Sequence, residues 1–399
     1  MIKRVVLMGL LAGCFPTRSQ ELTCDVTADC DDGRVCEGGF CVAGNDASVA
    51  PDANDAPDAV AFDCTPFTTK LFAGCDIPEP GEAIELTSGI ATYNTDTGTL
   101  DGAASPPSKD IPAGTLISIE KLTIASGATL RVIGSKPLII ASWSTIDVAG
   151  VIDASSTATE LGAGANPAGC STHAAVTGEA EQNGGGGGGG GSMLAVGGRG
   201  GNGDDSTGGV GGTAVAAPSL LGGCAGAAGG TGRQPGGAGG AGGGAVALTA
   251  LTSITIGGEI NAGGAGGAGA AGENGGGGGG GSGGMITVES ATVSVTGTLA
   301  ANGGGGGGGS TDNNNATGAP GQPGQLSATR ATGGAPNANG GGNGGLGGAG
   351  ATTLGGVGQN GGNDAGGGGG GSCGFIVVAS TAAATLGGAI SPAATQVPR

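Results

Sequence analysis

Short runs of alternating apolar and polar residues recur along the chain from about residue 115, and Gly, Ser and Asn bound each run. A period of two is typical of β-strands, because successive side chains of a strand point to opposite faces. Four segments with this pattern align with one another, and they begin at Pro137, Ala245, Met285 and Phe375. The segment at Met285 has one residue fewer in its middle. A weaker fifth copy runs through Ile117, Ile119, Leu122, Ile124 and Leu130.

Equivalent positions of the four segments hold similar apolar residues, which predicts that they face a common interior. The first strand contributes Leu138 and Ile140, Val246 and Leu248, Ile286 and Val288, and Ile376 and Val378. The second contributes Ile146 and Val148, Ile254 and Ile256, Val293 and Val295, and Ala384 and Leu386. The third contributes Ile152, Ile260, Leu299 and Ile390. A glycine precedes the third strand in every copy, where we expect a corner with a positive φ: Gly150, Gly258, Gly297 and Gly388.

Three short strands per repeat predict an all-β fold, a single-stranded parallel β-helix-like solenoid over residues 115–399. In such a fold each coil stacks about 4.8 Å from the next, so equivalent residues form internal ladders. Small aliphatic residues suit these ladders, which agrees with a chain that has only 6 Phe, 1 Tyr and 1 Trp. An antiparallel sandwich is the alternative. It explains the alternation, but it does not require equivalent positions to recur in register.

Glycine-rich inserts of unequal length separate the repeats, at 156–244, 264–284 and 304–374. Glycine supplies 101 of the 399 residues, and the lack of a Gly-X-Y period excludes collagen. Each insert leaves after a third strand and returns just before the next first strand. We therefore expect the inserts to emerge from the same corner of successive coils. Each contains uninterrupted glycine, at Gly184–Gly191, Gly275–Gly281, Gly303–Gly309 and Gly366–Gly371.

Two structures for these inserts are open. Glycine-rich sequence by default forms flexible, solvated loops. Alternatively, the inserts pack as polyglycine II helices, which have no internal hydrogen bonds and must pair sideways with their neighbours. Ordering glycine costs about 0.5–1 kcal/mol more per residue than ordering alanine. Anchoring both ends of each insert on one rigid edge would reduce that cost, so we expect at least partial packing.

The N-terminus has the pattern of an export signal. Lys3 and Arg4 precede an apolar run that is too short to span a bilayer, since spanning needs about 20 residues. The sequence Leu11-Ala12-Gly13-Cys14 then resembles the lipobox of bacterial lipoproteins. The resemblance implies a signal peptide over residues 1–13 and lipid on the Cys14 thiol. An ordinary signal peptide cut nearby is the alternative.

The residues after the lipobox are expected to tether and space the protein. Residues 14–23 would form a lipid-anchored tether, because several acyl chains give lasting attachment to a membrane. Phe15 replaces the Asp that commonly retains lipoproteins at the inner membrane, which favours the outer membrane. Residues 42–63 are rich in Asp, Ala and Pro, a composition typical of an extended acidic stalk. Residues 64–114 form a transition segment before the repeats.

Cysteine spacing predicts a small module over residues 24–41. Four cysteines within 18 residues of an exported chain indicate two disulfides with open connectivity, and zinc is the alternative: Cys24, Cys30, Cys36 and Cys41. Further disulfide candidates are Cys64 with Cys75 and Cys170 with Cys224. Cys373 is left over. It should be a free thiol if Cys14 is lipidated.

The lipobox, cysteine module, stalk and repeats together resemble Gly-rich surface lipoproteins of the myxobacterial type, in which the short cysteine-rich module is Dickkopf-like in pattern. The resemblance covers most of the chain. It implies an outer-membrane or cell-surface location and carries over no defined activity.

No constellation in the sequence predicts catalysis, a cofactor or a metal centre. His173 is the one histidine, and no carboxylate lies at a useful spacing from it. Asp147 and Asp153 are the only paired carboxylates inside a coil, at outward positions where solubility explains them. Residues 200–205 match half of a calcium-binding nonapeptide, but no second copy follows to complete a site.

The net charge of the chain limits the kinds of molecule that it is expected to bind. Removal of Lys3 and Arg4 leaves 11 basic and 31 acidic residues, a net charge of −20. Such a chain repels nucleic acid, so nucleic acid is not an expected partner. We expect a non-enzymatic, surface-displayed structural or adhesive lipoprotein, attached to a membrane through its N-terminal lipid, with extracellular polysaccharide or matrix as the candidate partner. The alternative is a polysaccharide-binding or polysaccharide-processing β-helix protein.

Overall fold

The computed structural model describes most of the chain from residue 62 onward and a few residues nearer the N-terminus. The described ranges are 25–26, 30, 34–37, 40–43, 62–102, 104–216, 219–312, 317–337 and 340–399. The chain divides into two units, Met1–Ala61 and Phe62–Arg399. No helix within the described ranges combines the length and the apolar character needed to cross a bilayer.

The described part of the first unit is a hairpin. Strand β1 (Arg34–Glu37) pairs antiparallel with β2 (Phe40–Ala43). A disulfide joins Cys30 to Cys41, and Cys36 is also disulfide-bonded. Cys24 lies outside the described residues.

The second unit is nearly all β and contains two mixed sheets. The first sheet has the order β20 (Thr395–Pro398), β17 (Phe375–Ser380), β15 (Met285–Val295), β13 (Ala245–Ile256), β10 (Leu138–Ser142), β7 (Gly114–Ile119), β6 (Ser108–Ile111). Four short strands join it: β3 (Ile84–Leu86), β8 (Leu122–Ile124), β11 (Thr145–Val148) and β18 (Thr385–Leu386). The second sheet has the order β19 (Ala389–Ser391), β16 (Thr298–Ala300), β14 (Glu259–Asn261), β12 (Val151–Asp153), β9 (Ala128–Ile133), β4 (Gly89–Asn94), β5 (Thr99–Leu100). Two short 3-10 helices are η2 (Gly74–Asp76) and η3 (Ala168–His173).

Strands from successive repeats pair in parallel and in the register that the aligned sequences predict. Ile140 lies opposite Leu248, Leu248 opposite Val288, and Val288 opposite Val378. The third strands match in the same way, with Ile152, Ile260, Leu299 and Ile390 side by side. The missing residue of the segment at Met285 appears as a register shift between β13 and β15 after Ala250. Antiparallel pairing occurs at β6 with β7 and β4 with β5.

The predicted inward side chains form one apolar core between the two sheets. Leu138, Ile140 and Ile254 are fully buried there, together with equivalent residues of the other repeats. Removing such a buried side chain typically costs about 2–5 kcal/mol, so this core fixes the stacking of the strands.

A second apolar cluster covers the opposite face of the first sheet, and the alternating pattern of the strands does not predict it. Ile139, Ala141 and Ala247 point away from the main core and are also fully buried. The segment that begins at Phe62 lies over them. Its aromatic rings pack on Trp143, with centroid distances of 5.0 Å for Phe62 and 5.1 Å for Phe67. The Cys64–Cys75 disulfide closes this segment.

The corner glycines correct one expectation from the sequence. Gly150, Gly258, Gly297 and Gly388 were expected to need a positive φ, and none of them has one. Their constraint is space. A Cβ added to Gly258 would lie 1.9 Å from the carbonyl oxygen of Gly150, and one added to Gly297 would lie 1.9 Å from that of Gly258. The corners of successive repeats stack too closely to admit a side chain.

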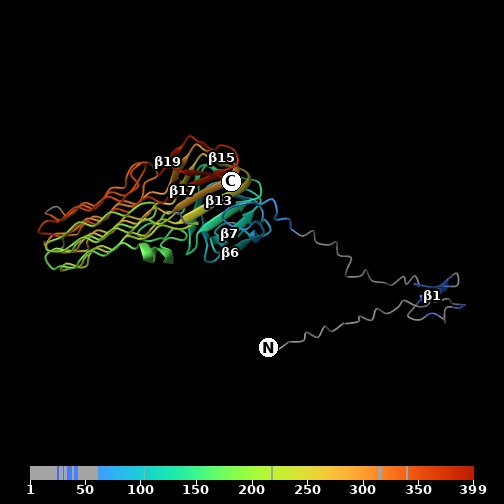
Figure 1. Ribbon diagram of the computed structural model, residues 1–399, viewed down its shortest axis with the longest axis horizontal. Coiled ribbons are helices and arrows are strands. Elements are labelled where there is room, and N and C mark those ends of the chain that lie inside the picture. Colours follow the sequence, from blue (N-terminus) through green and yellow to red (C-terminus); the bar gives the residue numbers. More distant parts are fainter. Residues whose placement is uncertain are drawn as a thin grey trace, which may run out of the picture. The chain divides into compact units, whose positions relative to one another are not determined.

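The glycine-rich inserts are packed rather than loose. Every residue of the runs Gly184–Gly191, Gly275–Gly281, Gly303–Gly309 and Gly366–Gly371 is buried. Figure 1 shows the insert segments leaving the strands side by side and turning back at the far end. We call the packed parts of the inserts, which are the described residues within 176–244, 262–284 and 302–374, the glycine lattice.

Hydrogen bonds within the lattice follow a period of three. Gly185, Gly188 and Gly191 donate their N–H groups to Asn274, Gly277 and Gly280 of a single neighbouring segment, each at 2.8 Å. The two residues between each of these donors serve two other segments: Gly186 and Gly189 donate to Glu179 and Val176, and Gly187 and Gly190 donate to Gly201 and Gly198. Three residues per turn without internal bonds is the geometry of polyglycine II.

Segments on all sides surround each uninterrupted glycine run. The run Gly184–Gly191 is hydrogen-bonded to segments 176–182, 196–203, 206–213, 222–232, 274–284 and 365–374. Three parallel runs close a ring, because Gly188 donates to Gly277, Gly277 to Gly366, and Gly366 to Gly185. The interior of the lattice is therefore backbone bonded to backbone.

Close approach explains why these runs contain only glycine. A Cβ added to Gly188 would lie 2.2 Å from the carbonyl oxygen of Ala227, and one added to Gly306 would lie 2.0 Å from that of Gly368. No glycine of the four runs has a positive φ. Glycine is thus required because it lacks a side chain, and its conformational freedom is not used.

The sheet order continues into the lattice. Segments ending at Gly244, Gly284 and Gly374 run directly into β13, β15 and β17, which are neighbours in the first sheet. The lattice keeps that order, since Gly243 donates to Ser282 and Gly283 donates to Ser372. The expectation that the inserts leave after third strands and return to first strands is confirmed.

We predict that Gly188→Ala destabilises the protein strongly, because the added methyl group meets backbone atoms that belong to another segment. Overpacking of this kind costs about 1–3 kcal/mol or more. The free energy of unfolding in urea measures it. The matched control is Val210→Ala, at a lattice position that is 58% exposed, where we expect a change within about 0.5 kcal/mol. Equal effects of the two substitutions would contradict the packed lattice.

Candidate functional site

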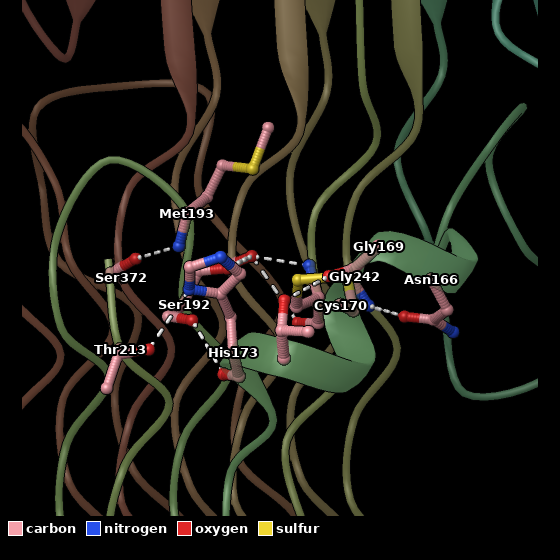
Figure 2. Close-up of a disulfide and its surroundings, with 12 residues drawn as sticks. Asn166, Gly169, Cys170, His173, Ser192, Met193, Thr213, Gly242 and Ser372 are labelled. Carbon is pink, nitrogen blue, oxygen red and sulfur yellow. Dashed lines mark hydrogen bonds between the residues drawn. A yellow bond between two sulfur atoms is a disulfide. The ribbon is translucent and has the colours of Figure 1, made fainter. Parts of the chain in front are cut away.

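The region where the lattice meets the strands contains a disulfide, the histidine and serine side chains of the inserts (Figure 2). Cys170 lies in η3 and is joined to Cys224, with a Cα–Cα distance of 5.5 Å. The bond closes a loop of 54 residues and ties η3 to a lattice segment. Nearby, the Asn166 side chain accepts a hydrogen bond from the N–H of Gly242 at 2.8 Å. Both interactions hold the first insert at its base.

A serine ends each of the four glycine runs, at Ser192, Ser282, Ser310 and Ser372. All four side chains are fully buried. Ser282 accepts a hydrogen bond from the N–H of Cys224 at 2.9 Å and donates to the carbonyl oxygen of Ser192 at 3.1 Å. Ser372 accepts from the N–H of Met193 at 2.9 Å, as Figure 2 shows.

Serine suits this place because the regular backbone pairing stops there. A buried N–H or C=O that loses its neighbour costs free energy unless another group replaces it. A hydroxyl both donates and accepts, and it is small enough for the crowded site. Ser310 has the same role at the far end of its run, where it accepts from the N–H of Gly275 at 3.0 Å. The serines therefore terminate the regular pairing of the lattice.

His173 contacts two residues of the first insert, Thr213 and Ser192. Its Nδ1 lies 3.0 Å from the hydroxyl oxygen of Thr213, and its carbonyl oxygen accepts a hydrogen bond from Ser192 at 3.2 Å. The Thr213 hydroxyl is a weak orienting group, and His173 is half-buried. Within the described ranges, no three His, Cys, Asp or Glu side chains gather closely enough to hold a metal ion. Among the described residues, His173 thus has a hydroxyl partner and lies in no cluster of three metal-ligating side chains.

The carboxylates that the sequence singled out are held by basic residues. Asp147 pairs with Lys121 at 3.7 Å, and Asp153 pairs with Arg131 at 3.2 Å. Arg131 is buried and also bonds Glu160 at 3.0 Å. Asp204 and Asp205 lie in a turn at the far end of the lattice, where the N–H of Gly203 donates to the carbonyl oxygen of Ser206. The half nonapeptide thus forms a lattice turn.

Cys373 is a free, fully buried cysteine. Burial raises the pKa of its thiol to about 12. Its sulfur lies 3.9 Å from the side-chain oxygen of Asn302, which is itself fully buried. The thiolate is the reactive form of cysteine, so the folded protein protects this group.

Two features of the sequence mark this region, although the strand pattern does not reveal them. One is the recurrence of a serine after each glycine run. The other is a local Gly-Gly-X period at the lattice edge, for example Val196-Gly-Gly-Arg199-Gly-Gly-Asn202. The absence of a Gly-X-Y period excludes collagen, but this local period marks segments that are packed on two faces and exposed on the third. Val196 and Arg199 are exposed, whereas the glycines between them are buried.

Other residues predicted from the sequence fall outside the described ranges. They are Cys14 with its signal sequence, Cys24 and most of the stalk. Cys170 with Cys224 and Cys64 with Cys75 form the disulfides suggested above, and Cys30 bonds Cys41. Comparison with protein-family models, curated proteins and solved structures found no match to the chain.

Replacing both Cys170 and Cys224 by Ser should lower the free energy of unfolding by about 4 kcal/mol. Without the bond that closes the 54-residue loop, the unfolded chain has more conformational entropy, and folding must remove it. Urea unfolding under oxidising conditions measures the change. Replacing both Cys64 and Cys75 is the matched comparison, with about 3 kcal/mol for an 11-residue loop. A larger loss for the Cys64–Cys75 pair would contradict the role assigned to Cys170–Cys224.

Cys373 should resist thiol reagents in the folded protein up to about pH 10, because a pKa of about 12 leaves it protonated. In urea the same thiol should react readily, since its ordinary pKa is near 9.0. Because the folded state holds this proton more tightly, its contribution to stability is present below pH 9 and is lost as the pH rises further. Mass spectrometry of the peptide containing Cys373 reports the labelling. Rapid native labelling at pH 8 would show that the thiol is accessible.

Proposed function

We propose that this protein is a non-enzymatic adhesive or structural protein, displayed at the cell surface or outer membrane by lipid on Cys14. The repeats would form a parallel β-helix-like solenoid, and the glycine lattice would project from it as a stiff arm. Parallel pairing of equivalent segments in successive repeats supports the solenoid. The fully buried, hydrogen-bonded glycine runs support the stiffness of the arm.

One observation carries the proposal: one set of lattice turns gathers at the end away from the strands, which we call the tip (Figure 1). Three of these turns are closed by a backbone hydrogen bond, from Gly184 to Glu181, from Gly232 to Gln234 and from Asp364 to Gly361. Surface turns on a rigid scaffold are common binding positions, because they vary without disturbing the fold.

Exposed amides and charges occupy these turns. Gln182, Asn183, Asp205, Gln234 and Asn363 are exposed there. Amide and carboxylate groups donate and accept hydrogen bonds in directions that suit sugar hydroxyls or polar protein surfaces. This composition supports extracellular polysaccharide or matrix as the partner, and it favours polysaccharide binding as the second candidate function.

Two variants test the proposal in cells. Cys14→Ser should release the protein from the membrane fraction, because the chain would have no thiol at this position to which lipid could be attached. A variant of the tip that combines Gln182→Ala, Asn183→Ala and Gln234→Ala should stay in the membrane fraction. It should bind matrix-coated beads at least tenfold more weakly than the unaltered protein. The control is Val357→Ala on the side of the lattice, which is 66% exposed and should bind like the unaltered protein.

The readouts separate the two parts of the proposal. Membrane retention of Cys14→Ser would overturn the lipid anchor. Bead binding that is equal for the tip variant and the unaltered protein would overturn the tip as the adhesive surface. Unchanged thermal unfolding of both variants shows that a loss is not caused by misfolding.

A further inference from the structure

One side of the glycine lattice contains an apolar groove near the strands. Its volume is about 480 Å³, and none of its lining residues is charged. Ala238 and Ala241 form one wall, and Pro320 and Pro323 form the other. Gly266 and Ala268 form the floor between them. Leu161, which is 47% exposed, lies at the groove together with Thr157 and Ala158.

The groove follows an edge where the lattice could accept another segment. Segment 262–272 is hydrogen-bonded to segment 235–244 on one side, through Ala265 to Ala241 and Ala268 to Ala238. It is bonded to segment 318–325 on another side, where Gly321 donates to Gly267. Within the described ranges, the N–H and C=O groups of Gly266 and Gly269 bond no other residue. The N–H and C=O groups of Gly239, in segment 235–244, also bond no other described residue.

The unpaired groups have the spacing of a particular conformation. Gly266 and Gly269 are three residues apart, so their free groups recur once per turn of a three-residue helix, about 9 Å along its axis. A peptide in the polyproline II or polyglycine II conformation presents its own N–H and C=O groups at the same interval. The lattice interior already uses this match, as in the donation from Gly267 to Gly305 and from Ala270 to Gly308.

The segment that forms the proline wall of the groove shows which residues an edge segment of the lattice can contain. Pro320 and Pro323 occur three residues apart in Gly318-Ala319-Pro320-Gly321-Gln322-Pro323-Gly324. Proline has no N–H and fixes φ near the value of this helix, so it leaves no unpaired donor on the outer side. Gly318, Gly321 and Gly324 of the same segment donate to Ala270, Gly267 and Gly264. One glycine in every three residues is therefore enough for a segment to join the lattice edge.

We propose that this groove binds an extended peptide with glycine at every third position, which adds to the lattice as one more three-residue helix. The occupant is a neutral, Gly/Pro/Ala-rich segment of a partner protein. Its glycines face Gly266 and Gly269, and its remaining side chains contact the alanine and proline walls. The binding mode corresponds to the addition of a strand at a sheet edge, where backbone hydrogen bonds supply affinity. It continues the established contacts of segment 262–272 and does not depend on a membrane location or on the function proposed for the tip.

The uncharged lining of the groove favours a neutral peptide over other classes of ligand. The chain carries a net charge of −18, but the groove contributes none of it. A basic peptide therefore gains nothing here. The groove also has no aromatic side chain, the group on which sugar rings usually stack, so a polysaccharide lacks its usual contact. A preformed polyproline II peptide loses little conformational entropy on binding.

The test uses the full chain and a fluorescein-labelled peptide of six Gly-Ala-Pro repeats, followed by fluorescence anisotropy. Ala268→Trp fills the floor of the groove and should raise the dissociation constant at least tenfold. The matched control is Val357→Trp, at an exposed lattice position on another side, which should bind like the unaltered protein. A second probe of six Val-Ala-Pro repeats keeps the extended conformation but replaces every inward glycine, and it should bind at least tenfold more weakly.

The outcomes decide the proposal. Saturable binding of one Gly-Ala-Pro peptide per chain, lost in Ala268→Trp and kept in Val357→Trp, would support it. Equal binding of the two probes, or equal binding by the two variants, would overturn it. Binding of neutral oligosaccharides at this groove without peptide binding would also overturn it, as would self-association through the groove that excludes the peptide. Thermal unfolding of each variant confirms that the lattice is intact.

Discussion

The close approach of glycine backbones is the constraint on which this protein depends. Within the lattice, carbonyl oxygens lie within a short distance of where a Cβ would be placed, for example 2.2 Å at Gly188 and 1.8 Å at Gly209. That approach allows each N–H to reach a neighbouring segment, for example from Gly188 to Gly277 at 2.8 Å. Glycine pays a large entropic penalty for this order, and hydrogen bonds of about 0.5–1.5 kcal/mol each offset it only when nearly all groups are paired. The serines at the run ends complete the pairing.

The strands make such a lattice possible. Parallel strands lie about 4.8 Å apart, and the order of β13, β15 and β17 continues into the segments that precede them. Each insert is therefore held at both ends before its glycines pair. The Cys170–Cys224 bond adds a covalent tie to the first and longest insert. Side chains then appear only where a segment has an open face, as at Val196 and Arg199. The surface of the lattice is variable, whereas its interior is fixed by space.

The repeated strands could be predicted from the sequence because their constraint is local and repeats. Ile140, Leu248, Val288 and Val378 alternate with residues of the other face in every copy, so the register followed from alignment. The cover over the first sheet could not be predicted in this way. Ile139 belongs to an uninterrupted apolar run, which indicates burial on both faces without showing that the segment around Phe67 supplies the second cover. At the corners, a glycine such as Gly258 has two physical explanations, and the alignment does not distinguish a positive φ from a lack of space. Nor does an alignment of strands show which lattice segments lie side by side, because every glycine offers the same donor and acceptor.

Amide hydrogen exchange of the folded protein, followed by mass spectrometry, tests the central claim most directly. The packed lattice predicts slow exchange throughout Gly184–Gly191, Gly275–Gly281, Gly303–Gly309 and Gly366–Gly371, comparable to that of β13 and β15. It also predicts faster exchange at edge residues such as Gly266 and Gly269, whose N–H groups are unpaired. Fast and uniform exchange across the four glycine runs, together with protected strands, would show that the inserts are loops and would contradict this account.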